Sequence, residues 1–208
     1  MLLHMQVRGV QLRGWKDTDI NGCEIVEALY ARNTNPIINL LALEGISSLS
    51  AFLPTIVESA GTSIPARQKA LYGAWLCGTC LGSVGMSLHH KLCHTLGGSF
   101  NMPHAETHTI ILPHALAYNA PAIPEVMEKI ASALPGSDGD AIKGLNLLLE
   151  KLKVKRGLKD FGFKEEDVDK AAEIAVQNQY WNPRPVEVGP IRELLRRAWA
   201  GEEARADL

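Results

Sequence analysis

The chain has 208 residues, of which 46% are hydrophobic and 21% charged, and its formal net charge is −2 at pH 7. This is the balance of an ordinary folded domain, and a charge so close to zero argues against the basic surface that binds nucleic acid. No segment approaches the roughly 18 uninterrupted apolar residues of a membrane helix, and the N-terminus has too many scattered charges for a secretory signal. Four cysteines are too few for a disulfide scaffold. We therefore expect a soluble cytoplasmic protein with reduced thiols and with neither a nucleic-acid nor a membrane partner.

The first 22 residues differ in character from the rest of the chain. They show no sustained period of 3.6 or 2 residues, and Gly9, Gly14 and Gly22 interrupt them. We expect residues 1–22 to be an irregular, poorly packed segment. From residue 23 to residue 208 the apolar residues recur with the period of helices, and no run alternates convincingly between apolar and polar residues. The sequence therefore predicts an all-α fold, with one helical domain at 23–208.

Prolines and glycines mark where the first helices should begin and end. An apolar stripe over residues 25–30 predicts a helix that ends before Pro36, and Pro36 suits the first turn of a second helix, which Pro54 should interrupt. A third helix, apolar nearly all round, is expected from about Pro65 to His94. A glycine pair at 97–98 should end it, and Pro103 should start the next helix. The third helix carries four glycines that would let neighbouring helices approach closely: Gly73, Gly78, Gly82 and Gly85.

Between residues 121 and 199 the expected helices are shorter and amphipathic. Breaks are expected at Pro135-Gly136, at Gly157 and at Asn182-Pro183. The four helices between these breaks are PEVMEKIASAL, DAIKGLNLLLEKLKV, EEDVDKAAEIAVQN and VGPIRELLRRAWA.

Six of the seven histidines fall between residues 89 and 114. His90 and His94 are four residues apart, so on a helix they lie on one face. His104 follows Pro103 at the start of the next helix, after a glycine turn that can fold the chain back. We therefore expect His90, His94 and His104 to meet in one place. The N-terminus of the second helix presents free N–H groups and a positive dipole end, which suit an anionic substrate.

Imidazoles so arranged have two interpretations. They bind metals or transfer protons near neutral pH, which favours a catalytic or metal site. Alternatively they cap helices or form hydrogen bonds inside a core. The second interpretation is the better one for His114, which lies within an apolar run, and for His89, which points away from the His90–His94 face.

Cys77 and Cys80 have the CxxC spacing of redox and zinc sites. A reactive pair usually lies at a helix N-terminus, where the dipole lowers the thiol pKa, whereas this pair falls within an apolar helix. No second CxxC is present to complete a zinc site. We therefore expect these thiols to be buried packing residues.

The stretch GMSLHHKLCHTLGGSFNMPHAETHTIILPHALAYN resembles the signature of iron-containing alcohol dehydrogenases, H-x-x-x-H followed ten residues later by P-H. The fuller string HHKLCHTLGGSF…PHAETHT…LPHALAYN is similar to the maleylacetate reductase branch in particular. So are ALYGAWLCGTCLGSVGM before it and YWNPRPVE after it. The resemblance runs from about residue 26 to about residue 201, and it implies the helical C-terminal domain of iron-containing alcohol dehydrogenases and dehydroquinate synthase-like proteins.

Maleylacetate reductases reduce a carbon–carbon double bond of maleylacetate, a dicarboxylate, to give 3-oxoadipate in the catabolism of aromatic compounds. NADH or NADPH is the hydride donor, bound by an N-terminal α/β domain, and the helical domain closes the cleft. The resemblance implies that His90, His94 and His104 are catalytic, that His94 also lies against the nicotinamide cofactor, and that His108 holds a substrate carboxylate. In relatives that bind iron or zinc, His90 and His104 match two metal ligands. A homodimer is a further expectation.

Two features depart from this family pattern. The chain has no strand–glycine turn–helix unit that would bind a dinucleotide, so we expect the nucleotide-binding half to be missing and the isolated chain to be inactive. The other two metal ligands of the relatives are an aspartate and a histidine four residues apart. Near their places this chain has Asn21 and Glu24.

Two other functions stay open from the residues alone. One is a metal-dependent helical protein of hydrolase type, which would use the histidine cluster but has only Glu106 as a nearby carboxylate. The other is a non-catalytic helical remnant. Metal content distinguishes the first from the reductase, and cofactor binding distinguishes the second.

Overall fold

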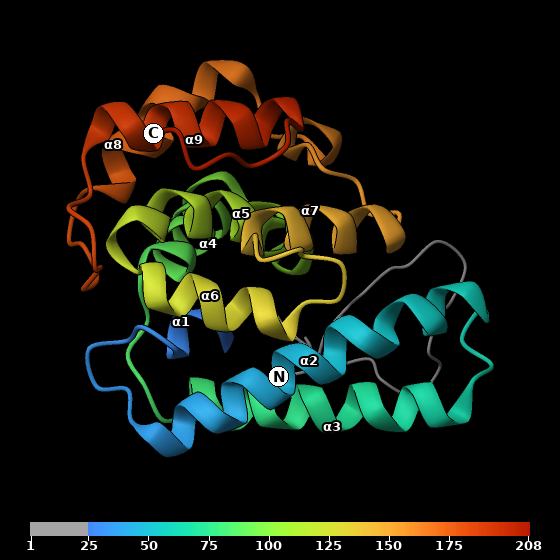
Figure 1. Ribbon diagram of the computed structural model, residues 1–208. Helices are drawn as coiled ribbons and strands as arrows, with labels where there is room; N and C mark the ends of the chain where they lie inside the picture. Colours follow the sequence, from blue (N-terminus) through green and yellow to red (C-terminus); the bar gives the residue numbers. More distant parts are fainter. Residues whose placement is uncertain (1–24) are drawn as a thin grey trace.

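The computed structural model describes residues 25–208, and within that range every regular element is helical (Figure 1), which confirms the all-α expectation. The irregular segment expected at 1–22 lies outside the described residues. The α-helices are α1 (Ile25–Ala28), α2 (Pro36–Glu58), α3 (Ile64–Leu81), α4 (Leu88–Phe100), α5 (His104–Asn119), α6 (Pro124–Ala133), α7 (Ala141–Lys151), α8 (Val168–Ala175) and α9 (Val188–Ala200). Short 3-10 turns are η1 (Ala120–Ala122), η2 (Leu158–Phe161) and η3 (Glu165–Asp167).

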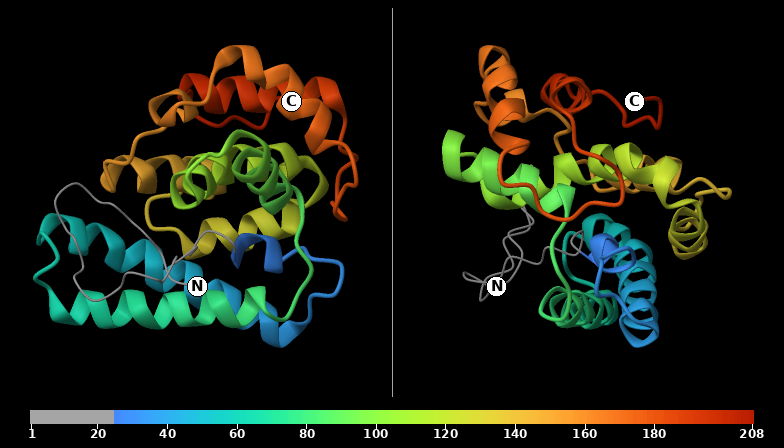
Figure 2. Two further views of the ribbon diagram at one scale, coloured as in Figure 1. Left: turned by 180° about the vertical axis from the view of Figure 1, so that it is seen from behind. Right: turned by 90° about the vertical axis from the view of Figure 1, so that its left-hand side faces the viewer.

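Helix α5 lies in the middle of the fold, where it packs against α4, α7 and α9. The α2–α3 pair lies at one end of the molecule and the α8–α9 pair at the other, in all three views (Figures 1 and 2). Two hydrophobic clusters fill the space between them: one joins α1, α2, α3, α6 and α7, and the other joins α4, α8 and α9. Helix α5 supplies residues to both clusters, and only three of its side chains, those of His104, Glu106 and Thr109, are not buried. Because α5 is buried on nearly every side, it has no solvent-facing polar stripe, and polar residues such as His108, His114 and Asn119 are buried along with its apolar ones.

Helices α2 and α3 pack closely because a glycine of each faces the other. A Cβ atom on Gly73 would lie 2.9 Å from Cγ of Leu49, and one on Gly45 would lie 2.5 Å from Cδ1 of Ile25. The expectation of close helix approach is therefore confirmed for Gly73. It is wrong for Gly78, which is exposed on the outer side of α3 with nothing within 4 Å of a Cβ.

The single helix expected from Pro65 to His94 is two helices. Helix α3 ends at Leu81, and α4 begins at Leu88. The backbone between them is held by side chains from far away in the sequence. The side chain of Asn33 accepts a hydrogen bond from the Gly85 N–H (2.9 Å) and donates one to the Ser83 carbonyl (3.3 Å). These distant partners replace helical hydrogen bonds, so the break leaves no trace in the local apolar pattern.

The glycine pair at 97–98 was expected to end this helix and lies inside α4 instead. Helix α4 ends at Phe100, followed by Asn101 with a left-handed φ of 53°, and α5 begins after Pro103 as expected. Pro54 also does not interrupt its helix, because α2 continues to Glu58.

Helix α2 is long and apolar enough to cross a membrane by length and composition alone, and 39% of its apolar window is buried. It packs against α1, α3, α6 and α7. Core helices of soluble proteins have the same composition, so this feature does not by itself indicate a membrane protein.

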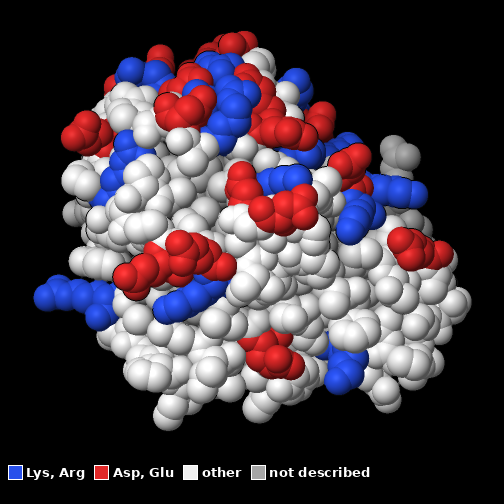
Figure 3. All heavy atoms as spheres, viewed as in Figure 1, with Lys and Arg blue, Asp and Glu red and all other residues white. Residues whose placement is uncertain are grey.

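Charged side chains are unevenly spread over the face in Figure 3. Lysine, arginine and acidic side chains gather over α7, α8 and α9, while the surface over α2 and α3 is largely uncharged. Several large apolar side chains of these two helices are exposed: Ile37, Leu40, Ile64, Tyr72 and Trp75.

Candidate functional site

Packing of α4 against α5 gathers five histidines into one cluster. The closest pair is His104 and His108, whose ring centroids are 4.1 Å apart. His108 is also near His90, at 5.4 Å, and His90 is 5.9 Å from His94. The three histidines that were expected to meet therefore do lie in one cluster, with His108 between His90 and His104. The i,i+4 spacing on each helix produces this row, because it repeats the same face at every turn.

Exposure changes along the cluster. His94 is exposed and His104 is partly exposed, whereas His90 and His108 are 2% and 1% exposed. Burial, together with the neighbouring imidazoles, lowers the pKa of His108 far below its ordinary value, so this ring is neutral at physiological pH. A reactant in solution would therefore meet His94 and His104 first.

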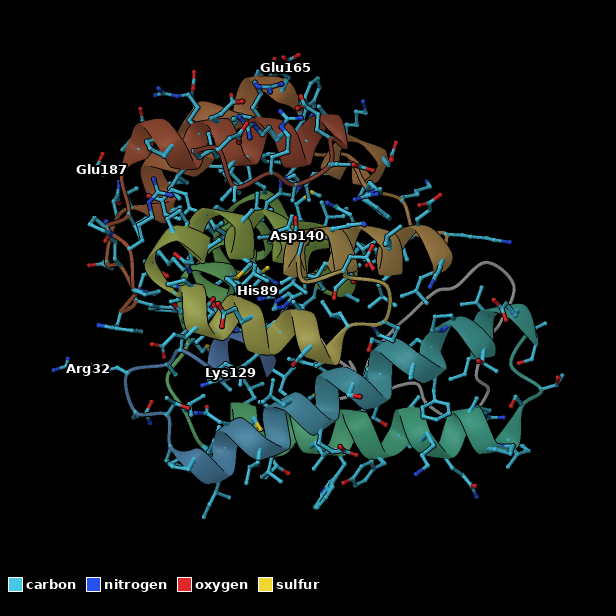
Figure 4. All side chains as sticks on the ribbon, viewed as in Figure 1. Arg32, His89, Lys129, Asp140, Glu165 and Glu187 are labelled. Atoms are coloured by element: carbon cyan, nitrogen blue, oxygen red, sulfur yellow. The ribbon has the colours of Figure 1, made fainter. Side chains whose placement is uncertain are left out.

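His89 lies on a different face of α4 from His90 and His94, as expected, but that face packs on α5. Its Nε2 lies 3.0 Å from the carbonyl oxygen of His108, and the two ring centroids are 4.9 Å apart. Figure 4 places His89 in the interior of the molecule, away from Arg32 and Glu165 at its edges. His89 is therefore part of the cluster.

His114 differs in its surroundings. Burial lowers its pKa to about 4, and the nearby positive charges of Arg156 and Arg197 contribute to this shift. A neutral, buried imidazole beside two arginines fits the structural role expected for it.

The carboxylate beside the cluster comes from Glu27 on α1, a residue that the sequence did not single out. Its Oε2 lies 2.6 Å from Nδ1 of His90 and accepts a hydrogen bond from the Ser87 N–H (2.9 Å). Its Oε1 accepts a hydrogen bond from the His89 N–H (2.6 Å). Glu27 thus holds the first turn of α4 and the ring of His90 at once. Its position in a buried helical stripe, where a carboxylate needs partners, was the available signal.

Glu27 is only 2% exposed, and opposing effects act on its pKa. Burial would raise the pKa, but the hydrogen bond with His90 and the nearby imidazoles of His89 and His90 lower it below its ordinary value. The carboxylate is therefore ionised in the folded protein at neutral pH.

Tyr180 is the second residue that the sequence did not single out. Its hydroxyl lies 3.1 Å from Nδ1 of His94, and the ammonium of Lys91 lies 5.8 Å from the centre of its ring. Both residues are on the exposed side of the cluster. They add a hydroxyl and a positive charge beside His94, which are groups suited to an anionic reactant.

The loop between α8 and α9 that carries Tyr180 is anchored to the helices. The side-chain amides of Asn182 and Asn119 exchange two hydrogen bonds, of 2.8 and 2.7 Å. The guanidinium of Arg184 donates to the Tyr118 carbonyl (2.7 Å) and lies over the ring of Tyr118. This loop was noticed in the sequence only as part of the family resemblance, because its contacts are with residues more than 60 positions away.

The described residues supply part of a metal site. A histidine that binds a metal usually has its other ring nitrogen on a carboxylate, which is the arrangement of His90 with Glu27. His90 and His104 are only two imidazoles, however, and catalytic zinc sites normally have three protein ligands. Asn21 and Glu24, near the places of the other two ligands, lie outside the described residues. The described residues thus do not complete an iron site of this kind.

The thiols of the CxxC pair are buried on α3, with Cys77 3% and Cys80 0% exposed. The Cys80 thiol donates to the Ile38 carbonyl (3.7 Å), and burial raises its pKa. Both observations agree with packing residues and not with a reactive pair.

Comparison with known proteins identifies the family of this chain. Residues 23–199 match the model of the family described as "Fe-containing alcohol dehydrogenase family, C-terminal". The maleylacetate reductase of Pseudomonas sp. (strain P51) is 51% identical over 177 residues, which are 85% of this chain and 49% of that protein. The maleylacetate reductase of Burkholderia cepacia is 48% identical over 93% of this chain and 54% of that protein.

The solved structures agree with the sequences. Maleylacetate reductase from Agrobacterium tumefaciens superposes with a TM-score of 0.83 and 47% identity, over 88% of this chain and 51% of that one. The chain thus spans about half the length of the relatives that it matches.

Proposed function

Because the chain belongs to the Fe-containing alcohol dehydrogenase family and matches its C-terminal region, we propose that it acts as the helical half of a maleylacetate reductase. The observation that carries this proposal is the 51% identity to the maleylacetate reductase of Pseudomonas sp. (strain P51) over 177 residues, which are 85% of this chain. The reaction is the NADH- or NADPH-dependent reduction of maleylacetate to 3-oxoadipate.

His94 is the proton donor or orienting group at the reacting bond. It is the exposed histidine of the cluster, and the Tyr180 hydroxyl fixes its ring by a hydrogen bond at Nδ1. A bound nicotinamide supplies hydride to one carbon of the double bond, and the protein need only supply a proton to the other and hold the substrate.

His104 and Lys91 hold the dicarboxylate. His104 is the first residue of α5, a 16-residue helix whose N-terminal N–H groups and dipole favour an anion. Lys91 adds a positive charge on the same side as His94. The carboxylate-binding role that the resemblance implies for His108 requires a substrate to reach a neutral side chain that is 1% exposed, so we assign that role to these more exposed groups.

His90 is oriented by Glu27 beneath this surface. The 2.6 Å contact between Nδ1 of His90 and Oε2 of Glu27 fixes the orientation of the ring, so that Nε2 points away from Glu27. His90 and His104 are the groups that would hold a metal if a further ligand were present.

The nicotinamide cofactor requires an N-terminal half of the relatives' kind. Residues 25–208 contain no strand, and hence no α/β unit for a dinucleotide. In this proposal the helical chain closes one side of the cleft and the nucleotide-binding half closes the other. A cytoplasmic location and a homodimer remain predictions.

The alternative of a metal-dependent hydrolase needs a carboxylate ligand near the histidines, and Glu27 lies beside His89 and His90. Both oxygens of Glu27 are already engaged, by two backbone N–H groups and by His90. A metal would have to displace these bonds, which makes Glu27 a better support for His90 than a ligand.

The test joins this chain to the nucleotide-binding half of a maleylacetate reductase, fused ahead of Glu24. We expect no NADH oxidation with maleylacetate by the isolated chain and clear oxidation by the fusion. Positioning hydride donor and acceptor is worth up to roughly 7–11 kcal/mol, which the isolated chain cannot supply. A fusion carrying Lys129→Ala, an exposed change on α6, should be as active as the parent.

Two outcomes would contradict the proposal. Robust turnover by the isolated chain would mean that it contains its own cofactor site. A well-folded fusion that stays inactive would count against the reductase assignment.

A further inference from the structure

A second group of ligand-type side chains lies on the inner face of α4, away from His94. His89 and Cys93 are four residues apart and so share one face of the helix, and His108 faces them from α5. One candidate ligand atom from each residue lies within 4.8 Å of the other two. All three side chains are 1% exposed. These residues are not the ligands that the family resemblance implies, and the proposed reduction does not use them together.

The chemistry of this group suits a soft divalent cation. One thiolate and two imidazoles are ligands that zinc favours, and three protein ligands are the number found in open zinc sites. Both imidazoles would bind the ion in their neutral form.

The hydrogen bonding of His89 also suits metal binding. Its Nε2 lies 3.0 Å from the His108 carbonyl, so Nδ1 is the ring nitrogen through which it would bind an ion. Metal-binding histidines commonly donate their second N–H to a backbone carbonyl, which fixes the tautomer and the ring orientation. The same carbonyl belongs to the third residue of the group, so the contact that orients His89 also ties the two helices together.

We propose that His89, Cys93 and His108 form a zinc-binding site in the core between α4 and α5. Binding takes up Zn²⁺ and releases the thiol proton of Cys93, so that a thiolate and two neutral imidazoles hold the ion. The site lies directly beneath the surface formed by His94, His104 and Tyr180, because the ring centroid of His108 is 4.1 Å from that of His104. It uses different ligands from that surface, and the proposal does not depend on the reductase function.

A competing set shares one member with this group. Ligand atoms of Glu27, His89 and His90 also lie within 4.8 Å of one another. An ion there would have to displace the hydrogen bonds that Glu27 accepts from the Ser87 and His89 N–H groups. The thiol-containing set requires no such loss of helix-capping bonds, and this is why we favour it.

The test uses the chain as it is. The purified protein is stripped of metal and titrated with Zn²⁺, and in parallel with Co²⁺, whose thiolate complexes have a charge-transfer band in the near ultraviolet. We expect about one equivalent of zinc and a cobalt–thiolate band. Both should be lost in Cys93→Ser and kept in Cys77→Ser, a matched control because Cys77 is also a buried helical thiol. Both should also be kept in His104→Gln.

A further measurement needs no substitution, in case Cys93→Ser does not fold. Alkylation of the native wild-type protein, read by mass spectrometry residue by residue, should become slower at Cys93 when zinc is present and stay unchanged at Cys77. Absence of the cobalt–thiolate band in folded protein, or its persistence in folded Cys93→Ser, would overturn the proposal. So would zinc binding that is lost in His104→Gln and kept in Cys93→Ser, because the ion would then lie at His90 and His104. None of these readouts involves enzymatic activity, so failure here and failure of the proposed function are distinguishable.

Discussion

Replacing Glu27 by glutamine exchanges one oxygen of a buried carboxylate for an NH2 group and removes the negative charge, while the size and shape of the side chain stay nearly the same. If the amide oxygen takes the place of Oε2, the bonds with the Ser87 N–H and with His90 are kept. The amide nitrogen then faces the His89 N–H, which donates to Oε1 in the wild type at 2.6 Å. A buried donor left without an acceptor costs about 1–3 kcal/mol, and loss of the charge weakens the two remaining bonds. We therefore expect Glu27→Gln to lower the free energy of unfolding by about 2–4 kcal/mol.

Urea denaturation followed by far-ultraviolet circular dichroism measures this loss as a shift of the midpoint at constant slope. Glu44→Gln, an exposed change on α2, is the matched control and should stay within about 0.5 kcal/mol of wild type. The pH dependence has a definite sign. Because the folded state lowers the pKa of Glu27 below 4.5, its contribution is present above that pH and is lost as the pH falls through the folded-state value. The gap between wild type and Glu27→Gln should therefore narrow in acid.

If Glu27→Gln lowers the free energy of unfolding by no more than Glu44→Gln does, this reasoning is refuted, since the three bonds to Glu27 would then contribute no net stability. A gap that widens as the pH falls below 4.5 would refute the assignment of an ionised carboxylate.

Three further predictions follow from single contacts. Gly73→Ala should cost about 1–3 kcal/mol in urea denaturation, because its Cβ would lie 2.9 Å from Leu49 Cγ, whereas Gly78→Ala, with open space around it, should gain about 0.5–1 kcal/mol. The pKa of His114 is lowered from 6.5 to about 4 in the folded state, so wild type should lose stability as the pH falls from 6.5 to 4. His114→Asn should lose less over that window, and equal losses in the two proteins would contradict the shift. In the fusion enzyme, His94→Ala should lower the turnover number much more than it weakens cofactor binding. An equal effect on both would mean that His94 does not act at the reacting double bond.

The fold class could be predicted because it depends on local patterns. The amphipathic stripes after residue 121 match α6, α7, α8 and α9 closely, since each of these helices buries one face. The meeting of His90, His94 and His104 could also be predicted, because it needs only an i,i+4 spacing and a helix start after Pro103.

What could not be predicted depends on residues that are distant in the sequence. The break between α3 and α4 is held by Asn33, about 50 positions earlier, and the start of α4 is held by Glu27, about 60 positions earlier. Tyr180 reaches His94 across 86 positions. No local pattern contains these pairings, because each is formed only after the helices have packed.

The glycine pair at 97–98 shows a different limit. Glycine lowers helix stability by about 1 kcal/mol per residue relative to alanine, so a pair favours a helix end. In the folded chain, Leu92 and Leu96 of α4 are buried in the hydrophobic core. This packing stabilises α4 by more than the glycine pair destabilises it, so the helix continues past residue 98.

The position of α5 has a consequence for how the chain unfolds. Its buried residues alternate between the two hydrophobic clusters, with Leu112 and Leu116 in one and Ile111 and Ala115 in the other. One cluster cannot lose its packing while α5 remains fully ordered against the second, because successive residues of the same turn belong to different clusters. The two halves of the core are therefore coupled through one helix and should melt as a single cooperative unit. A destabilising change beside α9 would then lower the melting temperature of the distant α2–α3 pair by the same amount.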